Sequence, residues 1–289
     1  MNKSFTLIEI LVVIVIVGIL SAFIIVSMAG VSSKATIAKG QAFSSSLKNS
    51  LMMNLVSEWK MDGNADDAWG SNNGTLVGPT HLPVAKSGSD CVSGGCYQFD
   101  GTEDYINCGN GTTLNIANAI TLEAWIKPSA ISGSQDIIAK PSNYVLELKP
   151  TGKITMALST NEGWHFTLDS IAGLSSGNWY HVVGSYSSAG AVVKFYINGV
   201  LDRTDTTSTS GMITTSANNL NLAYYNSGFP NRFGGLMDEV RLYNESVPVS
   251  EIQQKYYTGL NKLLVGGNFF KEEYRQRLGE LKMNLVDND

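Results

Sequence analysis

The stretch ITLEAWIKP, residues 120–128, alternates between two kinds of side chain with a period of two. In an extended strand, one face would carry the apolar residues Ile120, Leu122, Ala124 and Ile126. The opposite face would carry Thr121, Glu123, Trp125 and Lys127. The alternation therefore predicts a β-strand whose two faces meet different surroundings.

The same pattern recurs along the chain. Val193, Phe195 and Ile197 repeat the alternation, and Asn198-Gly199 follows directly. Both positions of a tight hairpin turn favour positive φ, which Asn and Gly adopt readily, so this pair predicts a hairpin. Further strands are expected at Tyr97–Phe99, Tyr144–Leu148, Ile154–Leu158, Trp179–Tyr186, Leu220–Ala223 and Leu236–Tyr243. Many short strands without intervening helices predict an antiparallel β-sandwich of the jelly-roll type.

The size of the chain suits either one large β domain with a membrane anchor or two small domains. The chain has 289 residues, of which 29 are glycine, and Asn, Ser and Thr are frequent. This composition suits short strands joined by turns. The formal net charge is -5, and the sequence shows no basic stripe or base-stacking motif. We therefore expect no nucleic-acid partner.

Three cysteines limit the covalent chemistry. Cys91 and Cys96 flank a Gly- and Ser-rich loop, whereas Cys108 follows a short strand. The chain lacks a CxxC pair or a Cys/His grid, so a structural zinc site is not expected. If the domain lies outside the cytoplasm, Cys91–Cys96 can close a tight loop as a disulfide. Pairing of Cys96 with Cys108 and three unpaired thiols are the alternatives.

An almost unbroken apolar run extends from Ile10 to Val26. Its length approaches the thickness of a bilayer core and favours a membrane helix, and Lys3 places its N-terminus on the cytoplasmic side. A cleaved secretory signal would have a shorter apolar core. A plain membrane anchor explains the length but leaves the acid Glu9 without a partner.

The segment KSFTLIE, residues 3–9, resembles the N-terminus of type IV prepilins and related pseudopilins. The resemblance implies that a prepilin peptidase cuts between Ser4 and Phe5 and that the new N-terminus on Phe5 is methylated. It also implies that Glu9 pairs with the N-terminal amine of a neighbouring pilin subunit, which stabilises both charges in apolar surroundings. The family usually has glycine where this chain has Ser4. The partners implied are the peptidase, the membrane and other pilin subunits.

The rest of the chain resembles the laminin-G-like, concanavalin A-like jelly rolls. The resemblance rests on GNADDAWGSNNGTLVG (63–78), YQFDGTEDYI (97–106), ITLEAWIKP (120–128), WYHVVGSY (179–186), FYINGV (195–200) and FGGLMDEVRLYNESVPVSEI (233–252). Four segments are expected: a prepilin leader (1–4), a long N-terminal α-helix (5–56), a jelly-roll head (57–259), and a C-terminal amphipathic helix or tail (260–289). The last helix, within Asn268–Asp289, would carry the apolar stripe Phe270, Tyr274, Leu278, Leu281 and Leu285.

Asp238 is the most informative acid. Alternation along its predicted strand places it on the face of Leu236, Val240 and Leu242, which should be the core face, where an unpaired carboxylate would be costly. The resemblance suggests a Ca²⁺ site at the sandwich edge, in which Asp238 joins Asp62 and Asp67 from the early acidic loop, beside Asp66. The alternative is that Asp238 accepts hydrogen bonds from backbone amides and that the loop is a solvated turn.

Aromatic residues in loops could stack on sugar rings. The candidates for ligand binding are Trp69, Trp164, Tyr225 and the polar Asn226, with Tyr224, Phe229 and Asn231 nearby in sequence. The alternative is that these residues pack in the fold, above all Trp164 and Tyr224, which lie close to predicted strands.

No catalytic set is expected from the sequence, so we do not expect an enzyme. The three histidines lie apart from any GxSxG-like signature. The glycosidases of this fold carry carboxylates at alternate positions of one strand. Glu123 and Glu147 each lack a second acid two residues away. The sequence instead predicts a minor pilin or pilin-like surface subunit that displays a lectin-like head outside the cytoplasm for adhesion to a glycan or a protein. The alternatives are a membrane-tethered lectin and a secretion-system pseudopilin.

Overall fold

A computed structural model describes residues 54–225 and 231–286, with side chains as far as Leu281. The predicted processing and assembly residues Ser4, Phe5 and Glu9 lie outside the described residues. Within the described ranges, we find no helix long and apolar enough to cross a membrane.

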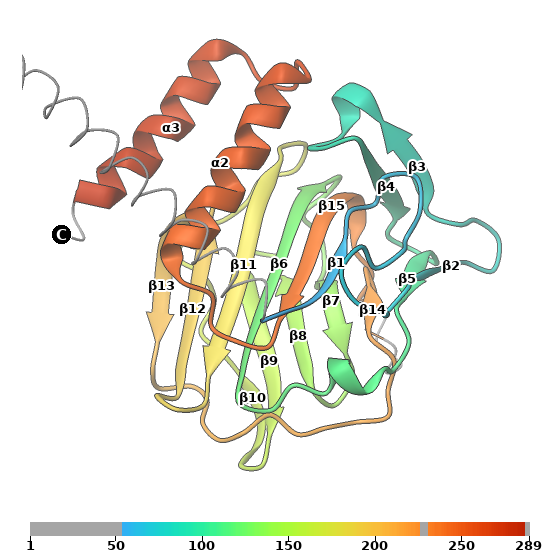
Figure 1. The fold of residues 1–289 in the computed structure, drawn as a ribbon, viewed down its shortest axis with the longest axis vertical. Coiled ribbons are helices and arrows are strands. Elements are labelled where there is room, and N and C mark those ends of the chain that lie inside the picture. Colours follow the sequence, from blue (N-terminus) through green and yellow to red (C-terminus); the bar gives the residue numbers. More distant parts are fainter. Residues whose placement is uncertain (1–53, 226–230, 287–289) are drawn as a thin grey trace, which may run out of the picture. The chain divides into compact units, whose positions relative to one another are not determined.

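The described residues form two antiparallel sheets, which we call sheet A and sheet B (Figure 1). Sheet A runs, in spatial order, through β13 (Val200–Asp205), β12 (Val192–Ile197), β11 (Tyr180–Ser187), β6 (Ala119–Pro128), β15 (Gly234–Tyr243), β4 (Gly95–Asp100) and β3 (Val84–Ser87), and β1 (Leu55–Trp59) also pairs with β15. Sheet B runs through β10 (Gly163–Phe166), β9 (Ile154–Thr160), β8 (Tyr144–Leu148), β7 (Gln135–Lys140), β14 (Asn221–Leu222), β5 (Tyr105–Asn107) and β2 (Thr75–Val77). The predicted antiparallel sandwich is confirmed.

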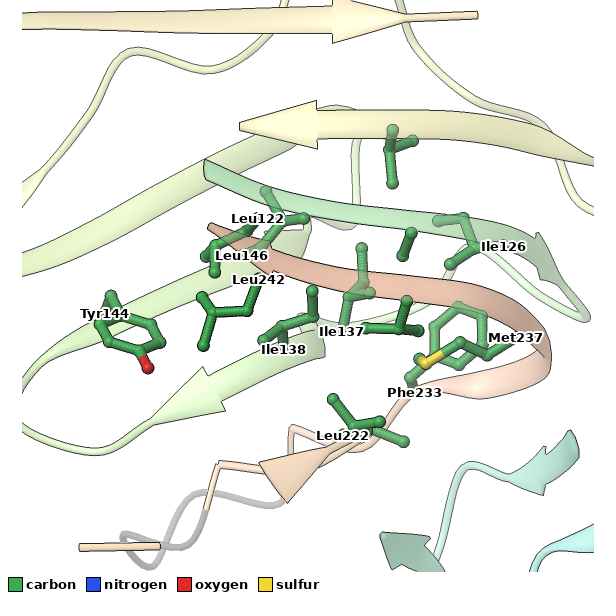
Figure 2. Packing of buried hydrophobic residues seen from close by; sticks show 14 of the residues in the cluster. Leu122, Ile126, Ile137, Ile138, Tyr144, Leu146, Leu222, Phe233, Met237 and Leu242 are labelled. Atoms are coloured by element: carbon green, nitrogen blue, oxygen red, sulfur yellow. The ribbon is translucent and has the colours of Figure 1, made fainter. Parts of the chain in front are cut away.

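The main core lies between the two sheets. Ile120, Leu122, Ala124 and Ile126 of β6 are all buried in it, as the period-two alternation predicted. Figure 2 shows Leu122 and Ile126 beside residues of β15, with side chains of sheet B such as Leu146 facing them. Each such apolar side chain stabilises the fold by roughly 1.5–3 kcal/mol on burial. The predicted hairpin is also present, because Asn198 and Gly199 link β12 to β13 with φ of 52° and 76°.

Two β-bulges change which face a side chain occupies. In β15, the register shifts between Asp238 and Arg241, and Glu239 has a φ of 49°. Val240 and Leu242 therefore point into the main core, whereas Asp238 lies on the opposite face beside Leu236. Asp238 is fully buried, but the prediction that it shares a face with Val240 and Leu242 was wrong. The extra residue of a bulge interrupts the alternation on which that prediction relied.

A second bulge lies in β7, where the register shifts between Asp136 and Ile138. Ile137 and Ile138 both enter the main core, and Ala139 lies in a separate cluster with Val145. Because two successive residues face inward, Asp136 is left on the outer face of sheet B.

Two helices follow the last strand and cover the outer face of sheet A (Figure 1). Helix α2 (Val249–Val265) buries Tyr256, Leu260 and Leu263 against Trp125 and Trp179, and α3 (Lys271–Val286) packs beside it. The sequence did not predict α2, and the expected boundary after residue 259 falls inside it.

Both ends of the predicted head need correction. The N-terminal helix was expected to continue through Val56, yet Leu55 and Val56 belong to β1, which pairs with β15. Their strand leads Trp59 into the main core. At the other end, Phe270 was placed on the apolar stripe of the last helix but is 83% exposed. Phe269 is buried instead, together with Leu281. Two short 3₁₀ turns, Gly88–Asp90 and Thr112–Leu114, complete the described elements.

Candidate ligand-binding groove

The outer face of sheet B carries a groove with a volume of about 270 Å³. Val145 and Ala157, on the adjacent strands β8 and β9, form part of its floor, and they cluster with Tyr225. Sheet B differs here from sheet A, whose outer face is covered by α2. The groove therefore gives a ligand access to strand side chains that the core does not use.

Aromatic side chains line the groove. Trp164 and Phe166 lie two residues apart on β10, so they share one face of that strand, and their rings meet edge to face with centroids 6.0 Å apart. Trp164 is 39% exposed and Phe166 more so. His165, between them, contacts Thr160 through Nε2 at 3.0 Å. Large aromatic rings exposed side by side are costly in water and mark a binding surface. The third ring is that of Tyr225.

Two carboxylates lie directly opposite each other in the groove. Asp136 of β7 pairs with Glu147 of β8 in the ladder, and both line the groove. Asp136 is 2% exposed and Glu147 is 6% exposed. Lys149 forms an ion pair with Glu147 at 3.3 Å, and its Nζ lies 5.9 Å from the centroid of the Phe166 ring. The groove thus combines apolar rings with nearly buried polar groups.

The carboxyl group of Asp136 is buried without a full set of hydrogen-bond partners. Its Oδ2 atom is buried and has no hydrogen-bond partner among the residues that the structure describes. Burial raises the pKa of Asp136 to about 8, the charge of Glu147 adds to this effect, and Lys149 opposes it. A buried polar atom without a partner costs about 1–3 kcal/mol. This cost would be recovered when a ligand supplies the missing partner.

A cation–π stack stabilises the two segments of chain that flank the groove. The guanidinium of Arg232 lies 3.7 Å from the ring centroid of Tyr224 and 5.5 Å from that of Tyr105. Arg232 also donates a hydrogen bond to the carbonyl oxygen of Glu103 at 3.1 Å. Isolated bridges connect Arg232 to both Asp136 and Tyr224. The stack thereby fixes the residues that flank Tyr225 and Asn231, which both line the groove.

The structure brings together two of the four residues predicted to bind a ligand. Trp164 and Tyr225 line the same groove. Trp69 is 44% exposed but is not among the residues that line it. Asn226 lies outside the described residues. The prediction of packing for Tyr224 fits its stack with Arg232.

Sequence reasoning missed the two groups that make the groove polar. Glu147 was noted as a lone acid, yet Asp136 lies opposite it. The pairing joins two strands, so spacing along one strand could not reveal it. Phe166 could have been predicted as a groove residue, since it follows Trp164 by two residues and therefore shares its face of the strand.

The three acids predicted to bind Ca²⁺ do not form a three-ligand cluster. Within the described ranges, the one group of three acidic, His or Cys ligand atoms within 4.8 Å of one another is His81, Asp100 and Glu103. Asp62 accepts a hydrogen bond from the amide of Gly95 at 2.7 Å. Each of the three acids instead holds backbone amides, which corresponds to the alternative considered for Asp238.

Asp67 organises the early acidic loop. Its Oδ1 atom accepts hydrogen bonds from the amides of Glu58, Trp69 and Gly70, and its Oδ2 atom accepts one from Asn72. Burial alone would raise its pKa, but these amide hydrogen bonds outweigh burial and hold the pKa of Asp67 below its ordinary value. The loop is thus built around the carboxylate itself.

Asp238 holds the disulfide loop. Cys91 and Cys96 are joined, which confirms the predicted disulfide, and Cys108 is buried as a free thiol. The amides of Val92 and Ser93, inside that loop, each donate to Oδ2 of Asp238 at 2.9 Å. Burial raises the pKa of Asp238 to about 8, with a further contribution from Glu239.

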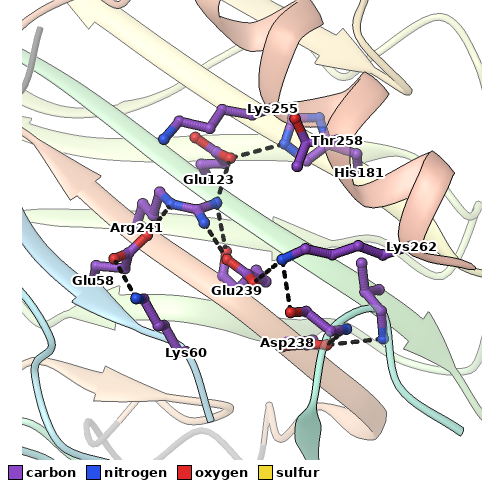
Figure 3. Close-up of polar contacts among 12 residues, drawn as sticks. Glu58, Lys60, Glu123, His181, Asp238, Glu239, Arg241, Lys255, Thr258 and Lys262 are labelled. Atoms are coloured by element: carbon purple, nitrogen blue, oxygen red, sulfur yellow. Dashed lines mark hydrogen bonds and ion pairs between the residues drawn. The ribbon is translucent and has the colours of Figure 1, made fainter. Parts of the chain in front are cut away.

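A buried ion-pair network lies under α2 on the outer face of sheet A (Figure 3). Arg241 contacts Glu58 at 2.7 Å and Glu123 at 2.9 Å, and it also pairs with Glu239. His181 Nε2 lies 3.0 Å from Glu123. Glu123, His181 and Arg241 are all buried, so the network connects sheet strands and does not face a ligand. Glu123, which looked alone in the sequence, has charged partners from other strands.

Comparisons with known proteins come from family models and from solved structures. A model described as the concanavalin A-like lectin/glucanases superfamily matches residues 100–253, and one described as the prokaryotic N-terminal methylation motif matches residues 1–25. A search of curated proteins found no match.

Solved structures share the fold at low identity. Domain 4 of the extracellular GH43 arabinanase AbnA from Geobacillus stearothermophilus, solved with arabinotriose, is 22% identical with a TM-score of 0.57, and the match covers 70% of this chain and 97% of that one. The receptor binding domain of botulinum neurotoxin mosaic serotype C/D is 15% identical with a TM-score of 0.54, over 73% of this chain and 52% of that one. A structure of botulinum neurotoxin type C, whose cell entry depends on two ganglioside molecules, is 11% identical with a TM-score of 0.51, over 73% and 53%. This chain thus spans about half the length of the toxin chains.

Proposed function

We propose, on the premise that this chain belongs to the concanavalin A-like lectin/glucanases superfamily, that its head binds a saccharide in the groove on sheet B. The N-terminal methylation motif at residues 1–25 is typical of pilin-type surface proteins. The whole chain would then be a minor pilin or pilin-like subunit that displays a lectin-like head at the cell surface for adhesion.

The observation that carries this proposal is the combination of Trp164, Phe166 and Tyr225 with the nearly buried acids Asp136 and Glu147 in one groove. A sugar ring has apolar C–H faces that stack on aromatic rings, and hydroxyl groups at its edge that need hydrogen-bond partners. Hydrogen bonds to charged groups contribute about 1.5–3 kcal/mol each. The groove offers both kinds of contact within one face of a rigid sheet.

The known neighbours support the proposal at the level of fold. Domain 4 of the arabinanase was solved with arabinotriose, and the type C neurotoxin depends on gangliosides. Both ligands are saccharides or carry them. For this chain, the identity of the saccharide must come from its own groove residues.

The N-terminal part of the proposal concerns assembly. We expect a prepilin peptidase to cut between Ser4 and Phe5, methylation of Phe5, and pairing of Glu9 with the N-terminus of a neighbouring subunit. A membrane-tethered lectin and a secretion-system pseudopilin are the other candidates. Mass spectrometry of the mature chain should find methylated Phe5 at the N-terminus, and Glu9→Ala should prevent filament assembly while the head stays folded. An intact Met1, or unchanged filaments from the variant, would contradict this part.

We propose binding without catalysis. The two groove acids are cross-strand neighbours on one floor, whereas a glycosidase places its two carboxyl groups on either side of the scissile bond. Incubation of the protein with a bound oligosaccharide, followed by chromatography, should return the oligosaccharide intact. Shorter products would establish a hydrolase.

The binding proposal is tested by a glycan array probed with the full-length chain in detergent. We expect retention of a defined set of saccharides, and we expect Trp164→Ala to weaken binding up to about ten-fold, since a contact with one aromatic ring contributes about 0.5–1.5 kcal/mol. Trp69→Ala is the matched control, because it removes an exposed tryptophan that does not line the groove. Equal losses for the two variants would place the saccharide elsewhere.

A further inference from the structure

The groove holds two acids but only one lysine among its described lining residues. Three of its described lining residues are ionisable, namely Asp136, Glu147 and Lys149, apart from the Tyr225 phenol. Lys149 is engaged with Glu147 at 3.3 Å. The nearby cation Arg232 stacks on the ring of Tyr224, close to that of Tyr105, and donates to a backbone carbonyl. When Asp136 is ionised, it therefore lacks a counter-charge of its own among the described residues that surround it.

Geometry directs the unpaired acid at a ligand. The bulge in β7 turns Asp136 onto the outer face of sheet B, where it lines the groove. Its side chain is almost fully buried, and the atom Oδ2 has no partner within the described ranges. A bound group with several N–H donors and a positive charge would satisfy both deficits together.

The aromatic walls favour the same kind of ligand. Trp164, Phe166 and Tyr225 line the groove near the two acids. The faces of aromatic rings attract cations, and a desolvated contact of this kind contributes about 2 kcal/mol. Lys149 shows the effect within the groove, since its ammonium lies 5.9 Å from the Phe166 ring centroid.

We propose that the saccharide bound in this groove carries a free, unacetylated amino group, and that its ammonium pairs with Asp136 beside Glu147. This inference rests on the proposed saccharide-binding function and names the class of saccharide. A uronic acid or a sialic acid would bring a further negative charge against two carboxyl groups, which opposes binding. A neutral sugar would bring no positive charge to favour the ionised form of Asp136.

The titration of Asp136 gives an independent signature. In the free protein its pKa is raised to about 8 by burial and by Glu147, so at pH 6 the group holds a proton. A bound ammonium favours the ionised carboxylate, and the proton must leave. Binding at pH 6 should therefore release up to about one proton more from the wild type than from Asp136→Asn.

The test uses the full-length chain in detergent and isothermal titration calorimetry at pH 6. The probes are trisaccharides of glucosamine and of N-acetylglucosamine, which differ in acetylation of the amine. We expect the wild type to bind the free-amine trisaccharide about ten-fold more tightly. Asp136→Asn should bring that ratio close to one. Glu162→Gln, an exposed acid on the turn before β10 and outside the groove, should preserve it, which separates a groove contact from general attraction to an acidic protein.

Each outcome decides between the claims. Equal affinity for the two trisaccharides, or a preference for the acetylated one, overturns the amine assignment. If Trp164→Ala still weakens neutral saccharides in that case, the proposed function stands alone. If no saccharide binds, both claims fail. A lysine-rich peptide that binds as tightly as the amino sugar and competes with it would replace the saccharide by a protein ligand. The wild-type comparison needs no variant, so it holds even if Asp136→Asn does not fold.

Discussion

The outer faces of the two sheets carry buried acids in different surroundings. On sheet A, Glu123 and Glu239 lie under α2 and pair with Arg241. On sheet B, Asp136 is almost equally buried, but it lines an open groove and its Oδ2 atom has no partner among the described residues. Burial alone therefore does not separate a structural acid from a binding one. Asp238 on sheet A is also buried with an oxygen that lacks a partner within the described ranges, so what distinguishes Asp136 is that it lines an open groove.

The covering helix explains why the two faces differ. Helix α2 packs Tyr256 and Leu260 onto Trp125 of β6, so the polar groups beside that tryptophan are sealed from water. Sheet B carries no described helix on its outer face, and its rings Trp164 and Phe166 stay partly exposed. The outer face of sheet A is packed against a helix, whereas the outer face of sheet B is open at the groove.

Removal of the shared cation should have the largest effect on stability. Arg241→Leu leaves Glu58, Glu123 and Glu239 near one another without their common partner. Loss of one partner from a buried ion pair costs about 3–5 kcal/mol, because the remaining charge stays desolvated. We expect a fall of that size in the free energy of unfolding, measured by urea titration.

The matched control is Arg275→Leu. Arg275 pairs with Glu272 on the exposed surface of α3 at 3.9 Å, and exposed pairs contribute about 0–1 kcal/mol. Similar losses for the two arginine variants would show that the network under α2 is not the stabilising element we describe.

The packing of α2 against sheet A should be disrupted by a single added methyl group. Gly259 lies so close to β6 that an added Cβ would stand 2.4 Å from Cζ2 of Trp125. Gly259→Ala must therefore shift the helix or the ring, and overpacking of this kind costs about 1–3 kcal/mol. Gly279→Ala, in α3, meets no heavy atom of the described residues within 4 Å, and alanine should stabilise that helix by about 0.5–1 kcal/mol. Urea titration should find opposite signs. Two changes of the same sign would contradict the tight contact.

The arrangement of strands could be predicted because it follows from local alternation. Residues 120–127 show both faces of β6 directly, and Asn198-Gly199 marks the β12–β13 hairpin. Helix α2 was readable but missed, because Ile252, Tyr256, Leu260 and Leu263 recur at helical spacing.

The groove could be predicted only in part. Trp164 and Tyr225 were candidates by residue type, since exposed aromatic rings often bind sugars. Asp136 could not be found in this way, for two reasons. Its face depends on a bulge, and its neighbour Glu147 comes from another strand. A bulge also explains why the predicted face of Asp238 was wrong, because the bulge at Glu239 adds one residue to a period-two pattern.

Replacing a buried acid by asparagine should change the free energy of unfolding with opposite sign and opposite pH dependence for Asp136 and for Asp205. The pKa of Asp136 is raised from 3.8 to about 8 by burial and by Glu147, against the attraction of Lys149. Between these pH values the folded chain holds a proton that the unfolded chain has lost, so the free energy of unfolding falls as pH rises. Asp136→Asn removes this cost. We expect the variant to match the wild type near pH 4 and to exceed its stability by a margin that grows as pH rises towards 8.

Asp205, at the end of β13 in sheet A, provides the opposite case. Burial tends to raise its pKa, but the hydroxyl of Ser208 and the amides of Leu168 and Thr207 outweigh burial and lower the pKa to about 2. Its contribution to stability is present above about pH 4 and is lost as pH falls towards 2. Asp205→Asn should therefore destabilise the head near pH 7 and match the wild type more closely in acid. Urea titrations of both variants across this pH range give the comparison. If Asp136→Asn also lost stability near pH 8, Asp136 would be an acid that the fold satisfies, and the contrast between the two faces would fail.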